Sequence, residues 1–325
     1  VDHFWHIVPG ARLERWKGLG GHPDPYTYEL MSPTSDHLHW GGGMWNQGGR
    51  ISGGNDALGG GHSHSDAMIY LGDRWPAEYR GTVFMSNIHG RRINRDAVIR
   101  RPGDGRYIAT HLPDFITVDD PWFRAISLQY GPDGDVIMSD WSDFGECHDR
   151  DGVHRSSGRL YKISWGQPRK VTVDLGKASV DELVAFQSHG SEWFVRHARR
   201  RLQELAADGV DLTTAHRALR AQFDAGDTSA AKLRALWALH VTGGADAAWM
   251  FTLLDHSDEH IRHWAVRLLA DTVPSSRLGP ALTHLAGAEP SWLVRMALAS
   301  ALGRLDLTAR VSVAKAMVPE LAADS

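Results

Sequence analysis

Two histidines set two residues apart raise the first question about chemistry in this chain. His62 and His64 stand in GGGHSHSDAMIY, residues 59–70, after three glycines and before an apolar run. On a strand, residues i and i+2 share one face about 7 Å apart, as two ligands of one metal ion would. Imidazoles beside a glycine-rich turn also form hydrogen bonds to the backbone. The pair therefore predicts either half of a metal site or a set of backbone contacts.

A second pair, His37 and His39, occurs in DHLHW. No HExxH motif accompanies either pair, so a third metal ligand would have to come from elsewhere in the chain. The single cysteine, Cys147, excludes an internal disulfide, a CxxC metal site and a CxxCH haem attachment. Zinc or haem chemistry therefore has no independent support in these residues.

Cationic side chains gather in NIHGRRINR, where three arginines and His89 follow an apolar strand expected over residues 82–88. Guanidinium groups at a strand end suit a bound anion, because they make planar, bidentate contacts. The alternative is a solvated arginine face that pairs with Asp96 and Asp104. The sequence is consistent with both interpretations.

Acidic side chains gather in SDWSDFGECHDRDG. Their oxygen atoms lie at short spacing, as calcium in a turn requires, but the string lacks the EF-hand pattern. A solvated loop closed by Arg150 and Arg155 is the alternative. The four acidic residues concerned are Asp143, Glu146, Asp149 and Asp151.

Two different architectures must position these residues. The first 176 residues hold 26 of the 34 glycines and 10 of the 14 prolines, and the remainder is rich in Ala, Leu and Arg. We therefore expect a β domain over residues 1–168, a linker around 165–179 and a helical domain over 178–325. Short strand-like runs separated by turn sequences such as GPDG are typical of propeller blades or sandwich sheets. The strands are expected over 67–71, 82–88, 107–111, 124–129, 135–140 and 159–164.

The helical domain contains a repeated unit. A branched or leucine residue precedes an arginine, and a leucine follows one helical face further on, in WFVRHARRRL, AKLRALWAL, EHIRHWAVRLL and WLVRMALASAL. The arginines Arg196, Arg234, Arg262 and Arg295 are separated by 38, 28 and 33 residues. Periods in this range predict paired helices stacked as a HEAT-like solenoid. The tryptophans there are expected to pack in the core, namely Trp237, Trp249, Trp264 and Trp292.

Net charge and hydropathy limit which classes of partner this protein is expected to bind. The formal net charge of −4 leaves no excess of basic residues for phosphates, so we expect no nucleic-acid partner. The chain has no apolar run long enough to span a bilayer, and VDHFWHIVPG lacks the features of a signal peptide. Because the chain opens and closes inside structural patterns, we expect it to be a portion of a longer protein.

Three stretches of the β domain resemble a known enzyme family. They are HSDAMIYLGDRWPAEYRGTVFMSNIHGRR, PWFRAISLQYGPDGDVIMSDW and GRLYKI, and they are similar to the last blades of pyrroloquinoline quinone (PQQ)-dependent glucose and sorbosone dehydrogenase-like propellers. With DHLHWGGG, DWSDFGECHDRDGVHRSSGRLYKI and the helical repeats, they resemble the large planctomycete-type membrane-bound dehydrogenases. These join such a propeller to HEAT repeats and usually to a cytochrome c module. The resemblance implies a partial β-propeller of about three to four blades, followed by a HEAT-like α-solenoid.

The resemblance also implies a cofactor face near the propeller axis. The family's PQQ carries carboxylates, and positive groups at the strand ends meet them. The family's general base and calcium ligands lie in earlier blades, and its haem module is not in this segment. The residues of this chain that match the cofactor face are His62, His64, His89, Arg91 and Arg124.

Two functions are therefore expected. In the first, the chain is part of an exported, periplasmic dehydrogenase, membrane-associated in its full form, which oxidises a sugar or alcohol and passes electrons to a cytochrome c module. In the second, it is a non-catalytic propeller that binds carbohydrate or protein, with the HEAT repeats as its scaffold and a protein partner on them.

Overall fold

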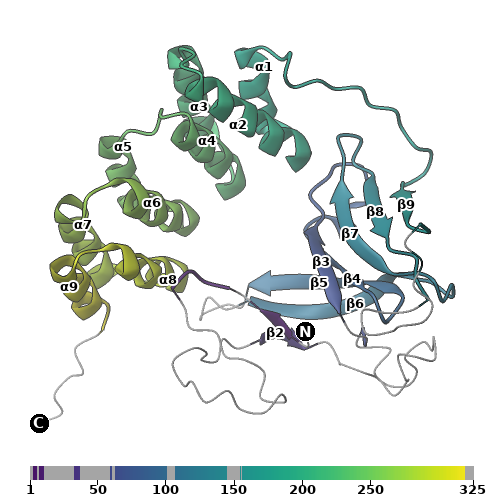
Figure 1. Cartoon of the computed structure of the whole chain (residues 1–325). Helices are drawn as coiled ribbons and strands as arrows, with labels where there is room; N and C mark the ends of the chain where they lie inside the picture. Colours follow the sequence, from purple (N-terminus) through teal and green to yellow (C-terminus); the bar gives the residue numbers. More distant parts are fainter. Residues whose placement is uncertain are drawn as a thin grey trace, which may run out of the picture.

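Strands come first in this molecule and α-helices follow (Figure 1). A computed structural model of the chain describes residues 3–5, 7–10, 33–36, 59–60, 63–100, 107–144, 154 and 156–318. In these ranges the last strand ends at Ile163 and the first α-helix begins at Val180. The expected order of β part and α part is confirmed. None of the helices described is both long and apolar enough to cross a membrane.

The described strands form antiparallel sheets of two, four and three strands, which we call the sheet part. The first sheet pairs β1 (His3–Trp5) with β2 (Pro33–Asp36). The second follows chain order through β3 (His64–Ile69), β4 (Val83–Asn87), β5 (Arg92–Arg100) and β6 (Tyr107–Thr117). The third contains β7 (Ala125–Tyr130), β8 (Val136–Asp140) and β9 (Arg159–Ile163).

The second and third sheets meet along β3 and β7. Ser65 donates its hydroxyl to the Ala125 carbonyl at 3.2 Å, and the Leu128 N–H donates to Asp66 at 2.8 Å. Behind this contact lies an aromatic core in which Tyr70 stacks on Trp75 with ring centres 4.5 Å apart. These described strands do not close into a barrel or a propeller, so the structure shows neighbouring antiparallel sheets rather than counted blades.

The tight turn between β7 and β8 requires a glycine at position 134. Gly134 adopts φ +77°, and a Cβ there would lie 2.4 Å from Cβ of Arg74. The Tyr70 hydroxyl donates to the Gly134 carbonyl at 2.7 Å, which fixes the turn against the aromatic core. The GPDG sequence therefore forms both the turn and a contact between the two sheets.

The α-helices alternate between the side that faces the sheets and the outer side of a curved array (Figure 1). We call this region the helical array. The sheet-facing helices are α2 (Glu192–Ala207), α4 (Ser229–Val241), α6 (Glu259–Thr272) and α8 (Trp292–Ala301). The others are α1 (Val180–Ala185), α3 (Thr213–Ala225), α5 (Ala247–Thr252), α7 (Ser275–Ala288) and α9 (Leu307–Met317).

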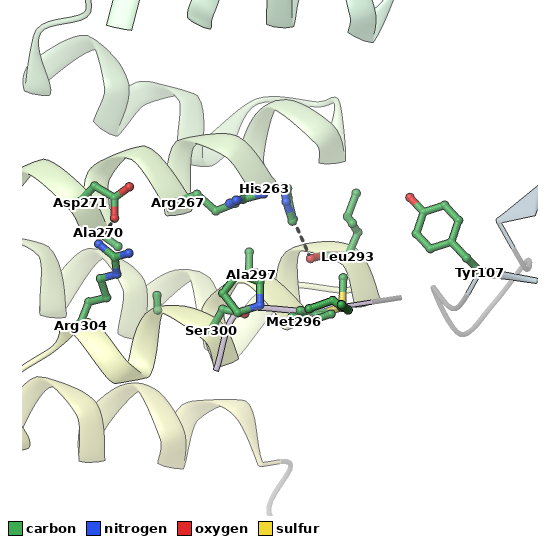
Figure 2. A pocket seen from close by; sticks show the side chains of 14 residues that line it. Tyr107, His263, Arg267, Ala270, Asp271, Leu293, Met296, Ala297, Ser300 and Arg304 are labelled. Carbon is green, nitrogen blue, oxygen red and sulfur yellow. Dashed lines mark hydrogen bonds and ion pairs between the residues drawn. The ribbon is translucent and has the colours of Figure 1, made fainter. Parts of the chain in front are cut away.

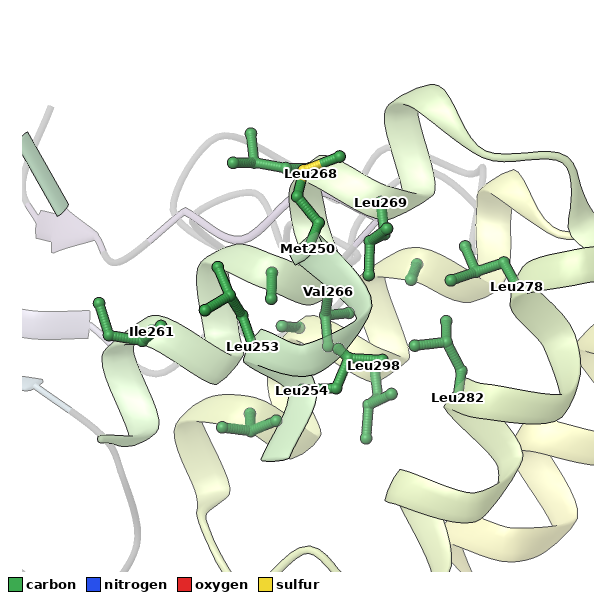
Figure 3. Packing of buried hydrophobic residues seen from close by; sticks show 14 of the residues in the cluster. Met250, Leu253, Leu254, Ile261, Val266, Leu268, Leu269, Leu278, Leu282 and Leu298 are labelled. Atoms are coloured by element: carbon green, nitrogen blue, oxygen red, sulfur yellow. The ribbon is translucent and has the colours of Figure 1, made fainter. Parts of the chain in front are cut away.

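Each sheet-facing helix begins at a residue whose side chain accepts a backbone N–H of the first turn. Such a cap satisfies one of the donors that a helix start leaves without a partner. The caps are Ser191, Thr228, Asp258 and Ser291. Buried aliphatic side chains then pack between successive helices, as Figure 3 shows for Ile261, Leu269, Leu278 and Leu298.

The repeated arginines link one helical pair to the next. Arg234 donates from Nε to Glu192 at 2.7 Å, and Arg262 makes two hydrogen bonds to Glu289 at 2.8 and 2.7 Å. Arg295 donates to the Glu289 carbonyl at 3.3 Å. Three of the four periodic arginines thus tie repeats together, whereas Arg196 pairs with Glu192 of its own helix.

The sheet part docks on the first sheet-facing helix through backbone contacts. The Glu192 N–H, at the start of α2, donates to the Leu71 carbonyl at 3.0 Å. Arg80 donates from Nη2 to the Gly190 carbonyl at 2.9 Å. Both contacts join the loop that follows β3 to the start of α2.

A second joint lies at the start of α6. Arg100, the last residue of β5, forms an ion pair and hydrogen bonds with Glu259. Ser291 donates its hydroxyl to the same carboxylate. The hydrogen bond from Arg100 is the largest reason that the pKa of Glu259 falls from 4.5 to about 2.

Truncating the core of the array should destabilise the protein strongly. Ile261 is 0% exposed, so Ile261→Ala leaves a cavity and should lower the free energy of unfolding by about 2–5 kcal/mol. Val311→Ala on the exposed side of α9 should change it by less than about 0.5 kcal/mol. Urea unfolding measures both, and equal effects would contradict the packing described.

Acid should weaken the joint at Glu259. Its pKa is lower in the folded protein than in the unfolded chain, so it stabilises the fold above pH 4.5 and loses this effect toward pH 2. Because Arg100 and Glu259 are 29% and 31% exposed, solvent screening limits the effect to about 1 kcal/mol. The unfolding free energies of wild type and Glu259→Gln should differ at neutral pH and converge near pH 2. Glu204→Gln, an exposed control on α2, should show no such convergence, and parallel curves for Glu259→Gln would refute the prediction.

Candidate binding site

A buried polar network joins the ends of β3, β4 and β5. His64 lies opposite Asn87 in the strand register, and its Nε2 is 3.1 Å from Oδ1 of Asn94. Asn87 donates to the same oxygen at 2.9 Å and to the Gly59 carbonyl at 3.1 Å. Gly59, in the glycine-rich segment before His64, therefore lies beside these strands, and its carbonyl also accepts from Asn94 Nδ2 at 3.3 Å.

The network continues to a buried ion pair. Asp114 on β6 accepts from Asn94 Nδ2 at 2.7 Å and from Arg92 Nη1 at 2.7 Å. His111 Nε2 lies 3.6 Å from the same carboxylate, and its Nδ1 lies 3.1 Å from Asp96. Arg92 is only 1% exposed, so the solvated arginine face considered for NIHGRRINR is wrong at this residue. The ion pair with Asp114 offsets the free-energy cost of burying the Arg92 guanidinium.

His89 and Arg91 lie in the turn from β4 to β5, and both are buried. Arg91 has φ +50°, and the preceding Gly90 donates its N–H to Asn87 Oδ1 at 2.9 Å. Burial alone would raise the pKa of Asp120, but the Trp122 N–H, Arg159 and the nearby charge of Arg91 lower that pKa overall. Arg91 therefore lies within electrostatic reach of the segment that leads into β7.

Arg124 lies before β7, on the other sheet, and is 3% exposed. Its guanidinium donates to the carbonyls of Phe123 at 2.7 Å and Phe144 at 3.2 Å. Its N–H donates to Asp140, which also binds Arg159. Arg91 and Arg124 thus border the same junction between sheets, where Arg159 bridges Asp120 and Asp140.

The described residues expected at the cofactor face make contacts within the protein. Each terminal nitrogen of Arg124 already donates to a backbone carbonyl, and His64, His89 and Arg91 make contacts within the protein. Among the described residues, no group of three or more His, Cys, Asp or Glu side chains could hold a metal ion. The described member of the acidic run, Asp143, is buried rather than solvated. Outside the described residues lie His37, His39, His62, Cys147, His148, Glu146, Asp149 and Asp151.

A different site lies on the sheet-facing side of the helical array. A cavity of about 670 Å³ opens between α2, α4 and α6, within the size range of ligand pockets. We call it the larger cavity. Leu71 of the sheet part lines it, so it is bounded by both parts of the molecule. Its other lining residues include Glu192, Arg196, Arg199, Ala230, Leu233, Arg234, Trp237, His260, Trp264 and Leu268.

Two arginines flank two neighbouring tryptophans in a row along this cavity, and we call the row the Arg–Trp ladder. The Arg199 guanidinium carbon lies 5.2 Å from the centre of the Trp237 ring. Trp237 meets Trp264 edge to face with ring centres 4.9 Å apart, and Arg267 lies 4.4 Å over Trp264. The ladder crosses from α2 through α4 to α6, so cation–π and aromatic contacts connect three helices.

Two buried donors of the ladder lack an acceptor. Neither Arg199 Nη1 nor Trp237 Nε1 has a hydrogen-bond partner within the described part of the chain. Burial lowers the pKa of Arg199, against the opposing charge of Glu192. The neighbouring Arg234, in contrast, is paired with Glu192. Buried donors without acceptors are uncommon in folded proteins and mark Arg199 and Trp237 as places where a ligand acceptor fits.

A smaller cavity of about 220 Å³ lies at the far end of the ladder (Figure 2). Residues 7–9 and Tyr107 approach α6 and α8 there. His263 donates from Nδ1 to the Leu293 carbonyl at 3.1 Å, and burial lowers its pKa, so the ring is neutral at pH 7. Arg267 lines this cavity while its ladder partner Trp264 lines the larger one. The ladder therefore connects the two cavities.

The sequence expectation for the tryptophans needs a correction. Trp249 packs against the core as expected, but Trp292 is 56% exposed. Trp237 and Trp264 pack partly on the core and partly line the larger cavity. The detectable signal was the Arg–x–x–Trp spacing of Arg234 and Trp237 inside the repeat, which places both on one helical face.

Comparison with known proteins gives a family likeness for the sheet part. Residues 29–164 match a family described as a domain of unknown function (DUF7133). No curated protein matches the chain. The matched range ends one residue after β9, so it includes β2 to β9 and none of the described α-helices. The likeness therefore concerns the sheets and the polar network, and it brings no activity with it.

Neutralising Asp114 should destabilise the sheet part. Asp114→Asn removes the carboxylate that faces buried Arg92, and breaking a buried ion pair from one side costs about 3–5 kcal/mol of unfolding free energy. Asp227→Asn, at an exposed aspartate, is the matched control. In a double-mutant cycle, Arg92→Met should recover part of the loss. Strictly additive effects in chemical denaturation would show that the two residues are not coupled.

Proposed function

We propose that this chain is a non-catalytic binding module whose helical array takes a segment of a partner protein. The observation that supports the proposal is the larger cavity on the sheet-facing side, with the Arg–Trp ladder across it. Tryptophan and arginine are the residues most enriched at energetically important positions of protein interfaces. Two tryptophans and three arginines are among the described residues that line this one cavity.

In this proposal the sheets support the helices that line the larger cavity. The contacts of Glu192 with Leu71 and of Arg100 with Glu259 connect the sheets to the starts of α2 and α6. These two helices form opposite walls of the larger cavity. Both joints therefore connect the sheets to helices that line the larger cavity, which would reduce the ordering needed when a ligand binds.

The dehydrogenase function implied by the resemblance is the second candidate. Its support is the sequence resemblance and the position of Arg91 and Arg124 at one junction between sheets. In it, the sheets would be propeller blades of an exported enzyme with PQQ and calcium, a sugar or alcohol as substrate and a cytochrome c module as electron acceptor. We assign no catalytic step to the described residues, whose polar groups make contacts within the protein.

One substitution tests the binding function. Short peptides are selected from a random display library on the purified chain, and their dissociation constants are measured by fluorescence anisotropy. Ala230→Trp fills the larger cavity from an exposed position of α4. The dissociation constants of the selected peptides should rise by at least about tenfold, which is the effect of losing one good contact. Ala221→Trp, on the exposed side of α3, should leave the affinities unchanged.

The opposite outcome identifies the alternative. Equal affinities of Ala230→Trp and wild type would exclude the larger cavity as the binding site. An increase in melting temperature on adding PQQ with calcium, together with dye-coupled oxidation of sugars, would instead support the dehydrogenase.

A further inference from the structure

We propose that the segment bound in the larger cavity is acidic, and that Arg199 and Trp237 bind a carboxylate of it. This inference rests on the proposed function and specifies the chemistry of the partner. The carboxylate would accept from Arg199 Nη1 and Trp237 Nε1, and an apolar neighbour on the same segment would pack on Trp264 and Leu233.

The charges of the lining residues favour an anion. Among the described residues that line the larger cavity, Arg196, Arg199 and Arg234 accompany one carboxylate, Glu192. Arg234 forms an ion pair with that carboxylate, with Nη2 2.5 Å from Oε1, while Nε of Arg196 lies 3.9 Å from Oε2. The lining therefore has an excess of two positive charges, although the whole chain has a net charge of −4. A local cationic site on an acidic protein is selective for the charge of its ligand.

The two buried donors specify a carboxylate rather than a diffuse negative charge. A guanidinium presents its N–H groups in a plane, and a carboxylate oxygen can accept from it and from a neighbouring donor. Arg199 and Trp237 lie on adjacent helices, with guanidinium and ring in contact. Because both atoms are buried, a side-chain rotation would have to accompany binding.

The apolar lining requires that the ligand be more than an anion. Leu233, Leu268 and the Trp264 ring form the rest of the wall, and the lining is more apolar than polar. Such a wall gains free energy only when it contacts apolar atoms. A segment in which aspartate or glutamate alternates with leucine-like residues satisfies both surfaces.

The ladder favours an extended segment over a small free acid. Beyond Trp264 it continues to Arg267, which lines the smaller cavity. A second acidic residue of the same segment would meet Arg267 there. Figure 2 shows this guanidinium extending along the cavity, near His263.

A pair of synthetic peptides tests the inference on the full chain. The probes are acetyl-Leu-Asp-Leu-Asp-Leu-amide and its neutral counterpart with asparagine at both acidic positions. The acidic peptide should bind at least about tenfold tighter, since a hydrogen bond to a charged group is worth more than one to a neutral group. In ¹⁵N-labelled protein, the indole N–H of Trp237 should shift downfield with the acidic peptide. Trp237→Phe assigns that signal among the 13 tryptophans.

Substitutions on one helix separate recognition from general charge. Arg199→Gln should reduce the preference for the acidic peptide to about twofold or less. Arg200→Gln removes an equal charge from an exposed neighbour, which pairs with Glu204, and should leave the preference intact. Trp237→Phe keeps an aromatic ring but removes the indole N–H donor. The affinity for the acidic peptide should therefore fall several-fold. Melting temperatures close to that of wild type confirm that the variants are folded.

The outcomes also distinguish this inference from the proposed function. Equal binding of both peptides, or an unchanged preference in Arg199→Gln, would overturn the inference. If display-selected peptides still failed to bind Ala230→Trp, the binding function itself would stand. Glutarate that matches the acidic peptide in affinity and in the Trp237 shift would overturn the assignment to a peptide, because a free diacid would then suffice.

Discussion

Glu192 joins the three functional regions of this molecule. Its N–H donates to the Leu71 carbonyl and so holds the sheet part against α2, while its carboxylate pairs with Arg234 and ties two helical repeats together. The same carboxylate is the acidic group among the lining residues of the larger cavity. One residue at the start of one helix thus contributes to docking, to repeat packing and to the charge of the cavity, and an acidic side chain at this position is also favoured by the helix dipole.

The arginines of the array differ in what they do, although the sequence presents them as equivalent. Arg234 and Arg262 are saturated by carboxylates and carbonyls, and they set the spacing of the repeats. Arg199 instead lies over Trp237 with a donor that has no acceptor in the described part of the chain. A cation kept by an aromatic face rather than by a carboxylate stays available to an incoming anion, since cation–π attraction leaves in-plane N–H groups without acceptors.

Sequence patterns predicted the architecture better than the site. The GPDG turn and the periodic arginines correctly indicated β7, β8 and the helical repeats, because turn chemistry and repeat spacing are local properties. The sequence-based expectation omitted β5, since Arg92 and Asp96 make it look solvated, and only the partners Asp114 and His111 show why such a strand can be buried. The cavity was not foreseen, because Arg199, Trp237 and Trp264 come together only when three helices stack.

In the binding mode proposed above, a partner's carboxylate lies between Arg199 and Trp237. A crystal structure of the full chain with a display-selected peptide tests it most directly. An acidic side chain of the peptide should lie within hydrogen-bond distance of Arg199 Nη1 and Trp237 Nε1, with an apolar neighbour on Trp264. A peptide bound on the sheets, or one that places only neutral groups against these two donors, would contradict it.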